Sequence, residues 1–203
     1  METIIYLIRH GETDWNREKR YQGQQDIPLN DLGRKQAFQL AKRLLNERYK
    51  IDAVYSSNLL RAKETAEIIA HHFDLKVQVH EGLKERHFGL LEGTKLEDFK
   101  AKYPDLTMRD IDQYEFFRAE PFQSFKERMY NAVLEVAQNH MNGKILLISH
   151  GAAIHSFLHE ITDGEFSSNS TKIVNTGITT IQYDYSNQKW SIIEINNVAH
   201  IGA

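Results

Sequence analysis

The sequence predicts an α/β fold, in which short strands alternate with helices along one chain. Two apolar runs, residues 6–8 and 146–148, each lead into a histidine followed by glycine. Runs of this kind are typical of buried parallel strands that end in a tight turn. Amphipathic helical patterns lie between further short strands, which is the pattern of α/β layers. A chain of 203 residues buries roughly 70% of its unfolded surface, so one sizeable core is expected.

The first half of the chain contains three expected strands and two expected helices. β-forming runs predict strands over residues 3–9 and 53–56. Asn30 is a preferred N-cap residue and Asp31 an acidic first-turn residue, so a helix is expected to follow and to continue through residue 48. A one-sided set of small and aliphatic residues predicts a helix over 60–73, and alternation predicts a strand over 76–80. The apolar face of the first helix is expected to contain Leu32, Phe38, Leu40, Ala41, Leu44 and Leu45.

The second half begins with a less periodic stretch that two Pro residues interrupt. We expect a single domain over residues 1–203, with a lid-like insert at about 94–122. Ser124 and Glu127 have the spacing of a capping box, which predicts the start of a long helix. A strand over 144–149, a helix to about residue 161 and a hairpin of 178–185 with 190–196 follow. The apolar face of the long helix is expected to contain Phe125, Met129, Ala132, Val133, Val136 and Ala137.

Composition limits the function. A net charge of −3 argues against a nucleic-acid surface. The absence of cysteine excludes disulfides, thiolate metal sites and cysteine nucleophiles. No apolar stretch has the length or the basic leader of a membrane span or signal peptide, so a cytoplasmic protein without a membrane partner is expected. His155 and His159 have the spacing of a zinc helix, but no Glu directly follows His155, and we expect no metal there. The oligomeric state is left open.

Basic and polar residues follow three of the predicted strands. Arg9, His10 and Asn16 come after the first strand, Arg61 lies in the first turn of the helix after the second, and His150 precedes a helix start. Ligands of open α/β sheets lie outside the carboxyl ends of the strands, and guanidinium groups and helix N-termini favour anions. Either histidine alone fits a core or strand-capping role, and Arg61 alone a surface charge. Together they predict an anion site.

Five ordered blocks of residues, which span nearly the whole chain, resemble the histidine phosphatase superfamily, the phosphoglycerate-mutase-like proteins. The blocks are residues 9–16, 22–29, 56–66, 83–93 and 149–151. The resemblance implies a three-layer α/β fold, with a mostly parallel sheet flanked by helices on both faces. It also implies transfer of a phosphoryl group through a phosphohistidine, with no metal and no other cofactor.

The resemblance also implies a role for each matching residue. His10 would be the nucleophile, Arg9, Arg61 and His150 would hold the phosphoryl oxygens, and Glu85 would donate a proton to the leaving group. The phosphate pocket would be completed by Asn16, Gln22, Gly23 and Gly151. Without the resemblance, the neighbours Lys84 and Arg86 favour an exposed ion-pair role for Glu85.

Physical chemistry is consistent with these roles. An imidazole attacks only when neutral, and nearby guanidinium groups disfavour its protonated form. Apolar walls would raise the pKa of the Glu85 carboxyl toward the working range of a general acid. Two further features are expected to be structural: Glu92 would cap or brace the loop near Gly93, and Asn175 would belong to a turn that could reach the rim of the pocket.

The insert separates a phosphatase from a mutase. A mutase grips a second anionic group with extra basic residues, but here the cations are scattered among acidic residues and no adjacent Arg pair occurs. An apolar mouth is expected from Tyr103, Tyr114, Phe116, Phe117 and Phe122. The chain most resembles small broad-specificity bacterial phosphatases, so the expected substrate is a small phosphate monoester. Alternatives are a cofactor-dependent phosphoglycerate mutase, a narrow bisphosphatase or sugar-phosphate phosphatase, and a non-catalytic phosphate-binding scaffold. A scaffold would be expected to have lost His10, His150 or Glu85.

Overall fold

A computed structural model describes residues 1–107, 110–166 and 172–201, and its centre is a six-stranded sheet of order β3-β2-β4-β1-β5-β6. The first four strands in this order pair in parallel, and β5 and β6 add an antiparallel hairpin at one edge. The predicted mostly parallel α/β sheet is therefore confirmed. The strands are β1 Glu2–Arg9, β2 Ala53–Ser56, β3 Val77–Val79, β4 Lys144–Ser149, β5 Ile178–Asp184 and β6 Lys189–Asn197.

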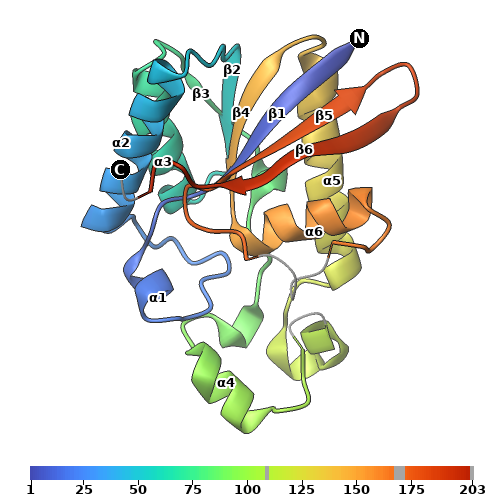
Figure 1. The fold of residues 1–203 in the computed structure, drawn as a ribbon. Helices are drawn as coiled ribbons and strands as arrows, with labels where there is room; N and C mark the ends of the chain where they lie inside the picture. Colours follow the sequence, from blue (N-terminus) through green and yellow to red (C-terminus); the bar gives the residue numbers. More distant parts are fainter. Residues whose placement is uncertain (108–109, 167–171, 202–203) are drawn as a thin grey trace.

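Helices cover both faces of this sheet (Figure 1). The α-helices are α1 Asp14–Arg17, α2 Asp31–Asn46, α3 Leu60–His71, α4 Leu96–Lys102, α5 Phe122–Asn139 and α6 Gly151–Ile161. Short 3₁₀ helices are η1 Glu81–Leu83, η2 Gly89–Leu91, η3 Asp110–Gln113 and η4 Glu115–Phe117. The helices α2 and α3 lie on one face, and α5 and α6 lie on the other.

The alternation of side chains in the central strands gives each face its own core. In β1, Ile5 and Leu7 pack against α5 and α6, whereas Tyr6 and Ile8 pack against α2 and α3. Strand β4 divides its side chains in the same way. Because successive strand residues point to opposite faces, a continuous apolar run fits a strand covered on both sides.

Two details of the predicted helices are wrong. Of the expected α2 face, Leu32, Phe38 and Leu45 are exposed, while Gly33 and Ala37 are buried with Leu40, Ala41 and Leu44. Helix α5 does not begin with a capping box at Ser124. It begins three residues earlier, with Pro121 in the N-cap position, and the Asp112 carboxylate accepts a hydrogen bond of 2.8 Å from Phe122 N. A residue distant in sequence thus satisfies an amide that a local cap would satisfy. The predicted apolar face of α5 is buried in full.

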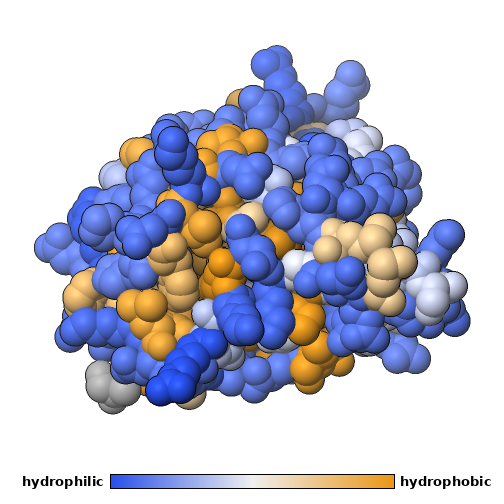
Figure 2. All heavy atoms as spheres, turned by 90° about the horizontal axis from the view of Figure 1, so that it is seen from above, coloured by the Kyte–Doolittle hydropathy of each residue, from blue (hydrophilic) through white to orange (hydrophobic). Residues whose placement is uncertain are grey.

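The predicted insert, residues 94–122, contains α4, η3 and η4 in its described part and lies beyond the carboxyl ends of the parallel strands, beside α1 (Figure 1). Phe99, Ile111 and Phe117 form a third, smaller apolar cluster there. The cluster also contains Leu91 of η2 and Phe88, the residue directly before η2. The opposite end of the molecule is mostly hydrophilic, with a band of apolar residues across its middle (Figure 2). Among the described residues, no helix has the length and apolar character that crossing a membrane requires.

Candidate active site

The two histidines lie side by side because their strands are neighbours. Strands β1 and β4 pair in parallel with Arg9 opposite Ser149, so the next residue of each strand leaves the sheet at the same edge. His10 N donates to Ser149 O at 3.0 Å, and the rings of His10 and His150 have centroids 5.1 Å apart. Both residues are buried. The predicted convergence of the two strand ends is therefore present.

The surroundings of His10 define which of its nitrogens carries a lone pair. Nδ1 lies 2.7 Å from Gly11 O, and because a carbonyl only accepts, Nδ1 carries the proton and Nε2 the lone pair. Arg61 Nε donates to this Nε2 at 3.3 Å. Burial lowers the pKa of His10 well below its usual value, and the charges of Arg61 and Arg9 lower it further. The ring is therefore neutral at pH 7, with burial as the larger cause and the expected guanidinium groups as the smaller one.

Arg61, on the first turn of α3, is buried and held by a neighbouring loop. Its Nη1 donates to Gln25 O at 2.8 Å and its Nη2 to Gly23 O at 2.7 Å. Burial lowers the pKa of Arg61 to about 10, opposed by the Glu85 charge, so the guanidinium remains charged at neutral pH. The solvated surface position that Arg61 alone would favour is not the one observed.

Glu92 anchors the loop that holds Arg61. Its Oε1 accepts from Gln24 N at 2.9 Å and from Phe88 N at 3.0 Å, and its Oε2 accepts from Gln25 Nε2 at 2.8 Å. Gly23 has a positive φ of 53°, and a Cβ at this position would lie 1.9 Å from Glu92 Oε1. The loop therefore requires glycine here, both for its backbone conformation and for the close approach of the carboxylate.

Arg9 and His150 each present a buried nitrogen that lacks a hydrogen-bond partner among the described residues, Nε of Arg9 and Nδ1 of His150. The other side of each group is fixed: Arg9 Nη1 donates to Ile173 O at 2.8 Å, and His150 Nε2 lies 2.7 Å from Ser57 Oγ. Ser57 Oγ accepts from Leu59 N at 3.4 Å, and among the described residues its own proton has no acceptor other than His150 Nε2. The Ser57 hydroxyl therefore donates to Nε2 and leaves the imidazole proton on Nδ1. Buried polar groups normally have partners, so two buried donors near His10 indicate an anion.

Glu85 is buried at the start of α6 and does not form the exposed ion pair that its neighbours would favour. Its Oε1 accepts from Arg86 N at 2.9 Å and its Oε2 from Ala152 N at 3.0 Å. Lys84 pairs with Glu81, and Arg86 pairs with Asp112. Burial raises the pKa of Glu85, although the two N–H groups and the charges of Arg61 and Arg9 oppose the shift. The N-terminus of α6 was expected to bind a ligand anion. One of its amides, Ala152 N, instead donates to the Glu85 carboxyl.

Asn16 and Gln22 are connected to this cluster through Thr13 and Asn175. Thr13 Oγ1 donates to Gln22 Oε1 at 2.9 Å, and Thr13 N donates to Asn16 Oδ1 at 3.2 Å. Asn175 Nδ2 donates to His10 O at 2.8 Å and to Asn16 Oδ1 at 3.3 Å. The predicted turn at Asn175 therefore does reach the site, where it supports the main chain of His10.

A cavity of about 480 Å³ opens onto the cluster. Of the predicted site residues, all but His150 line it, and His150 lies buried beneath. The expected aromatic mouth is largely wrong: of its five residues, Phe122 lines this cavity, whereas the other four line a separate one of about 360 Å³. The outer wall instead contains Tyr21, Phe88, Leu96, Phe122, Phe125 and Ile173, with Arg20, Arg86, His155, Ser156, His159 and Lys172.

The sequence profile described as "Histidine phosphatase superfamily (branch 1)" matches residues 5–198. The chain belongs to this superfamily. A Bacillus subtilis protein named as the uncharacterized phosphatase PhoE is 35% identical over 98% of this chain and 97% of its own length. A metal-independent phosphoserine phosphatase of Arabidopsis thaliana is 33% identical over 99% of this chain and 84% of its own. Among solved structures, YhfR of Bacillus stearothermophilus superposes with a TM-score of 0.87 at 31% identity, over 98% of each chain.

The contacts of two residues of the site were not predicted: Ser57 had no predicted role, and Asn175 was expected in a turn without its hydrogen bond to His10. Ser57 lies inside a matching block, but its partner His150 is 93 positions away, so no local pattern indicates the contact. Asn175 lies 165 positions from His10. Only the pairing of the strands brings either residue to its partner.

Proposed function

We propose that this protein is a phosphomonoester hydrolase that works without a metal, through a phosphohistidine at His10, on small phosphorylated metabolites. The observation that carries the proposal is the pair of buried donors, Arg9 Nε and His150 Nδ1, beside a neutral imidazole with its lone pair on Nε2. Phosphoryl transfer depends mainly on positioning and on stabilisation of charge. The phosphatases named among the relatives are consistent with this chemistry.

In the first step His10 Nε2 attacks phosphorus, and the bond from phosphorus to the ester oxygen breaks. Arg61 would turn its Nε–H from His10 to a phosphoryl oxygen, and Arg9 and His150 would donate to the other oxygens. An alkoxide is a poor leaving group, so the ester oxygen takes the Glu85 proton as it departs. The raised pKa of this buried carboxyl favours the protonated form that the step needs.

In the second step water attacks the phosphohistidine. The Glu85 carboxylate takes a proton from this water, the P–N bond breaks, and inorganic phosphate leaves with His10 again neutral. Glu85 therefore returns to its protonated form, and the cycle consumes one water for each ester.

Replacement of the nucleophile tests the mechanism. We expect His10→Ala to abolish turnover of p-nitrophenyl phosphate, with EDTA present throughout. Rapid quench of the wild type with labelled substrate should trap acid-labile, base-stable phosphate on the peptide that contains His10. Label on a serine, or substantial activity in the alanine variant, would contradict the mechanism.

A mutase is the second candidate, and cations in the outer wall favour it. Arg20, Arg86 and Lys172 line the cavity and would attract a second anionic group. Two of them are already engaged, Arg20 with Glu18 and Arg86 with Asp112, which favours the phosphatase. The two candidates differ in product: a mutase would convert 3-phosphoglycerate to its 2-isomer, whereas a phosphatase would release inorganic phosphate.

We further propose that residues 94–122 act as a lid within a single domain of residues 1–203. The supporting observation is the position of α4 beyond the carboxyl edge of the sheet, with Leu96 in the cavity wall. A lid at this place would limit substrates to small esters and exclude water during the first step.

A further inference from the structure

The segment that carries Glu85 lacks the hydrogen bonds of a strand ladder. Residues 82–85 comprise the end of η1 and the two residues that follow it, and they pair with no strand, so their carbonyl groups need other partners. Leu83 O accepts from Ser149 Oγ at 2.8 Å. On the other side, Arg128 of α5 donates to the carbonyls of the remaining three residues, at 2.8 Å for Gly82, 3.1 Å for Lys84 and 3.4 Å for Glu85.

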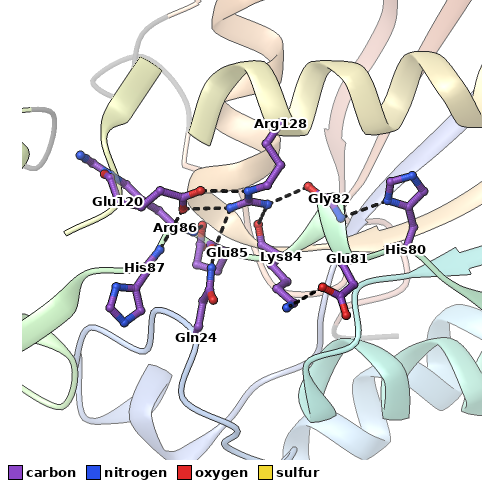
Figure 3. A network of polar contacts seen from close by, with 10 residues as sticks. All are labelled: Gln24, His80, Glu81, Gly82, Lys84, Glu85, Arg86, His87, Glu120 and Arg128. Atoms are coloured by element: carbon purple, nitrogen blue, oxygen red, sulfur yellow. Dashed lines mark hydrogen bonds and ion pairs between the residues drawn. The ribbon is translucent and has the colours of Figure 1, made fainter. Parts of the chain in front are cut away.

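All five N–H groups of the Arg128 guanidinium are used in this arrangement. Besides the three carbonyls, Nε and Nη2 each donate at 2.9 Å to one oxygen of the Glu120 carboxylate. Figure 3 shows the guanidinium between Glu120 and the backbone that leads to Glu85. A planar fork of five donors matches this set of acceptors, and the three donors of a lysine ammonium do not.

Glu120 in turn connects Arg128 to the residues after Glu85. Its Oε2 accepts from His87 N at 3.1 Å, its N donates to His87 O at 2.8 Å, and its O accepts from Arg86 Nε at 2.9 Å. The Glu85 carbonyl also accepts from Gln24 Nε2 at 3.0 Å (Figure 3). The main chain is therefore held by Arg128 before Glu85, by Arg128 and Gln24 at Glu85, and by Glu120 after it.

We propose that Arg128, oriented by Glu120, is a positioning residue that sets where the Glu85 carboxyl lies relative to the leaving oxygen. The proposal rests on the proposed function, in which Glu85 is the proton donor. The Glu85 carboxyl is fixed on its far side by Ala152 N of α6, so a shift of the main chain would change the direction of its proton. Misplacement of a catalytic group by about 1 Å costs on the order of 10²-fold in rate.

The test compares two leaving groups, because only a poor one needs the Glu85 proton. Arg128→Lys keeps the charge and removes the fork. We expect kcat/KM for an alkyl phosphate to fall about 10- to 100-fold, and the burst of phosphohistidine formation from p-nitrophenyl phosphate to change less than about threefold. The alkaline limb of the pH profile for the alkyl ester should shift as well. In a Glu85→Gln background, Arg128→Lys should have little further effect on the alkyl ester.

Two further variants complete the experiment. Lys126 lies in α5, like Arg128, and forms an ion pair with Glu160 of α6. Lys126→Met removes this ion pair without touching residues 82–85, and it should leave the rates with both substrates unchanged. Glu120→Gln keeps the shape of the orienting group. Like Arg128→Lys, it should lower kcat/KM for the alkyl phosphate more than the burst with p-nitrophenyl phosphate, but by a smaller factor. If Arg128→Lys does not fold, Glu120→Gln takes its place in the test.

Two outcomes would overturn the role of Arg128: equal losses for both esters, or losses that add fully to those of Glu85→Gln. Wild-type enzyme that releases phosphate from neither ester would instead overturn the proposed function itself.

Discussion

Removal of the Ser57 hydroxyl tests whether the proton of His150 is fixed for catalysis. Ser57 Oγ lies 2.7 Å from His150 Nε2, and both residues are fully buried. In Ser57→Ala, Nε2 of the fully buried His150 side chain loses its hydrogen-bond partner, which costs about 1–3 kcal/mol. The imidazole proton is then free to move to Nε2, which would remove the donor that faces the anion from Nδ1.

The magnitude in rate follows from the same bond. If the whole cost appears in the transition state, kcat/KM falls about 5- to 150-fold. If it appears only in folding, the free energy of unfolding falls by about 1–3 kcal/mol. Tm then falls by about 2–4 °C for each kcal/mol lost. We expect the first result, with a parallel rise in the inhibition constant of vanadate, an oxyanion that stands in for the transferring phosphoryl group.

The assay measures kcat/KM, vanadate inhibition and Tm on Ser57→Ala and on a matched control. Thr3→Val removes another buried hydroxyl, whose Oγ1 donates to His140 O at 2.8 Å at the opposite end of β1. The control should lose stability and keep its activity. A Ser57→Ala enzyme with a lower Tm but unchanged kcat/KM and vanadate affinity would refute the reasoning.

Three further predictions concern the same cluster and its pH dependence. Arg61→Lys keeps the charge but loses the fork to Gly23 O and Gln25 O, so vanadate inhibition should weaken at least tenfold, and an unchanged inhibition constant would contradict this. Gly23→Ala should lower Tm and activity together, because of the positive φ and the overlap with Glu92; a fully stable, active variant would show that the loop relaxes. Burial lowers the pKa of His10 and His150, and that of His200 to about 4. The unfolded chain therefore binds more protons below about pH 6.5, and the free energy of unfolding falls on acidification. For His200 the fall is up to about 2 kcal/mol at pH 5, so urea denaturation of His200→Gln should show a smaller loss from pH 7 to 5, and an equal loss would contradict it.

The order of elements and the central residues of the site could be predicted from the sequence because both depend on local patterns. Apolar runs that end in His-Gly mark β1 and β4, and their parallel pairing brings His10 and His150 together. The apolar stripe of α5 likewise follows from a helical period, since tertiary packing selects a stripe that the sequence already contains.

The errors arise where a distant residue replaces a local signal. The start of α5 is set by Asp112, which lies inside the insert ten residues before Phe122, and not by the local Ser124–Glu127 spacing. The aromatic residues of the insert were expected at the mouth, yet Tyr103 and Phe117 pack around Phe99. The composition of the segment does not indicate which cavity its aromatic residues border.

The close approach of the two histidines is a property of the main chain and not of the side chains around them. Adjacent strands lie about 4.8 Å apart, and the rings that follow β1 and β4 have centroids 5.1 Å apart. The spacing of the hydrogen-bonded strands therefore sets the distance between the two imidazole rings. Core side chains behind these strands can be exchanged for others of similar volume without moving the two strand ends. Insertion of a single residue into either strand would separate the rings.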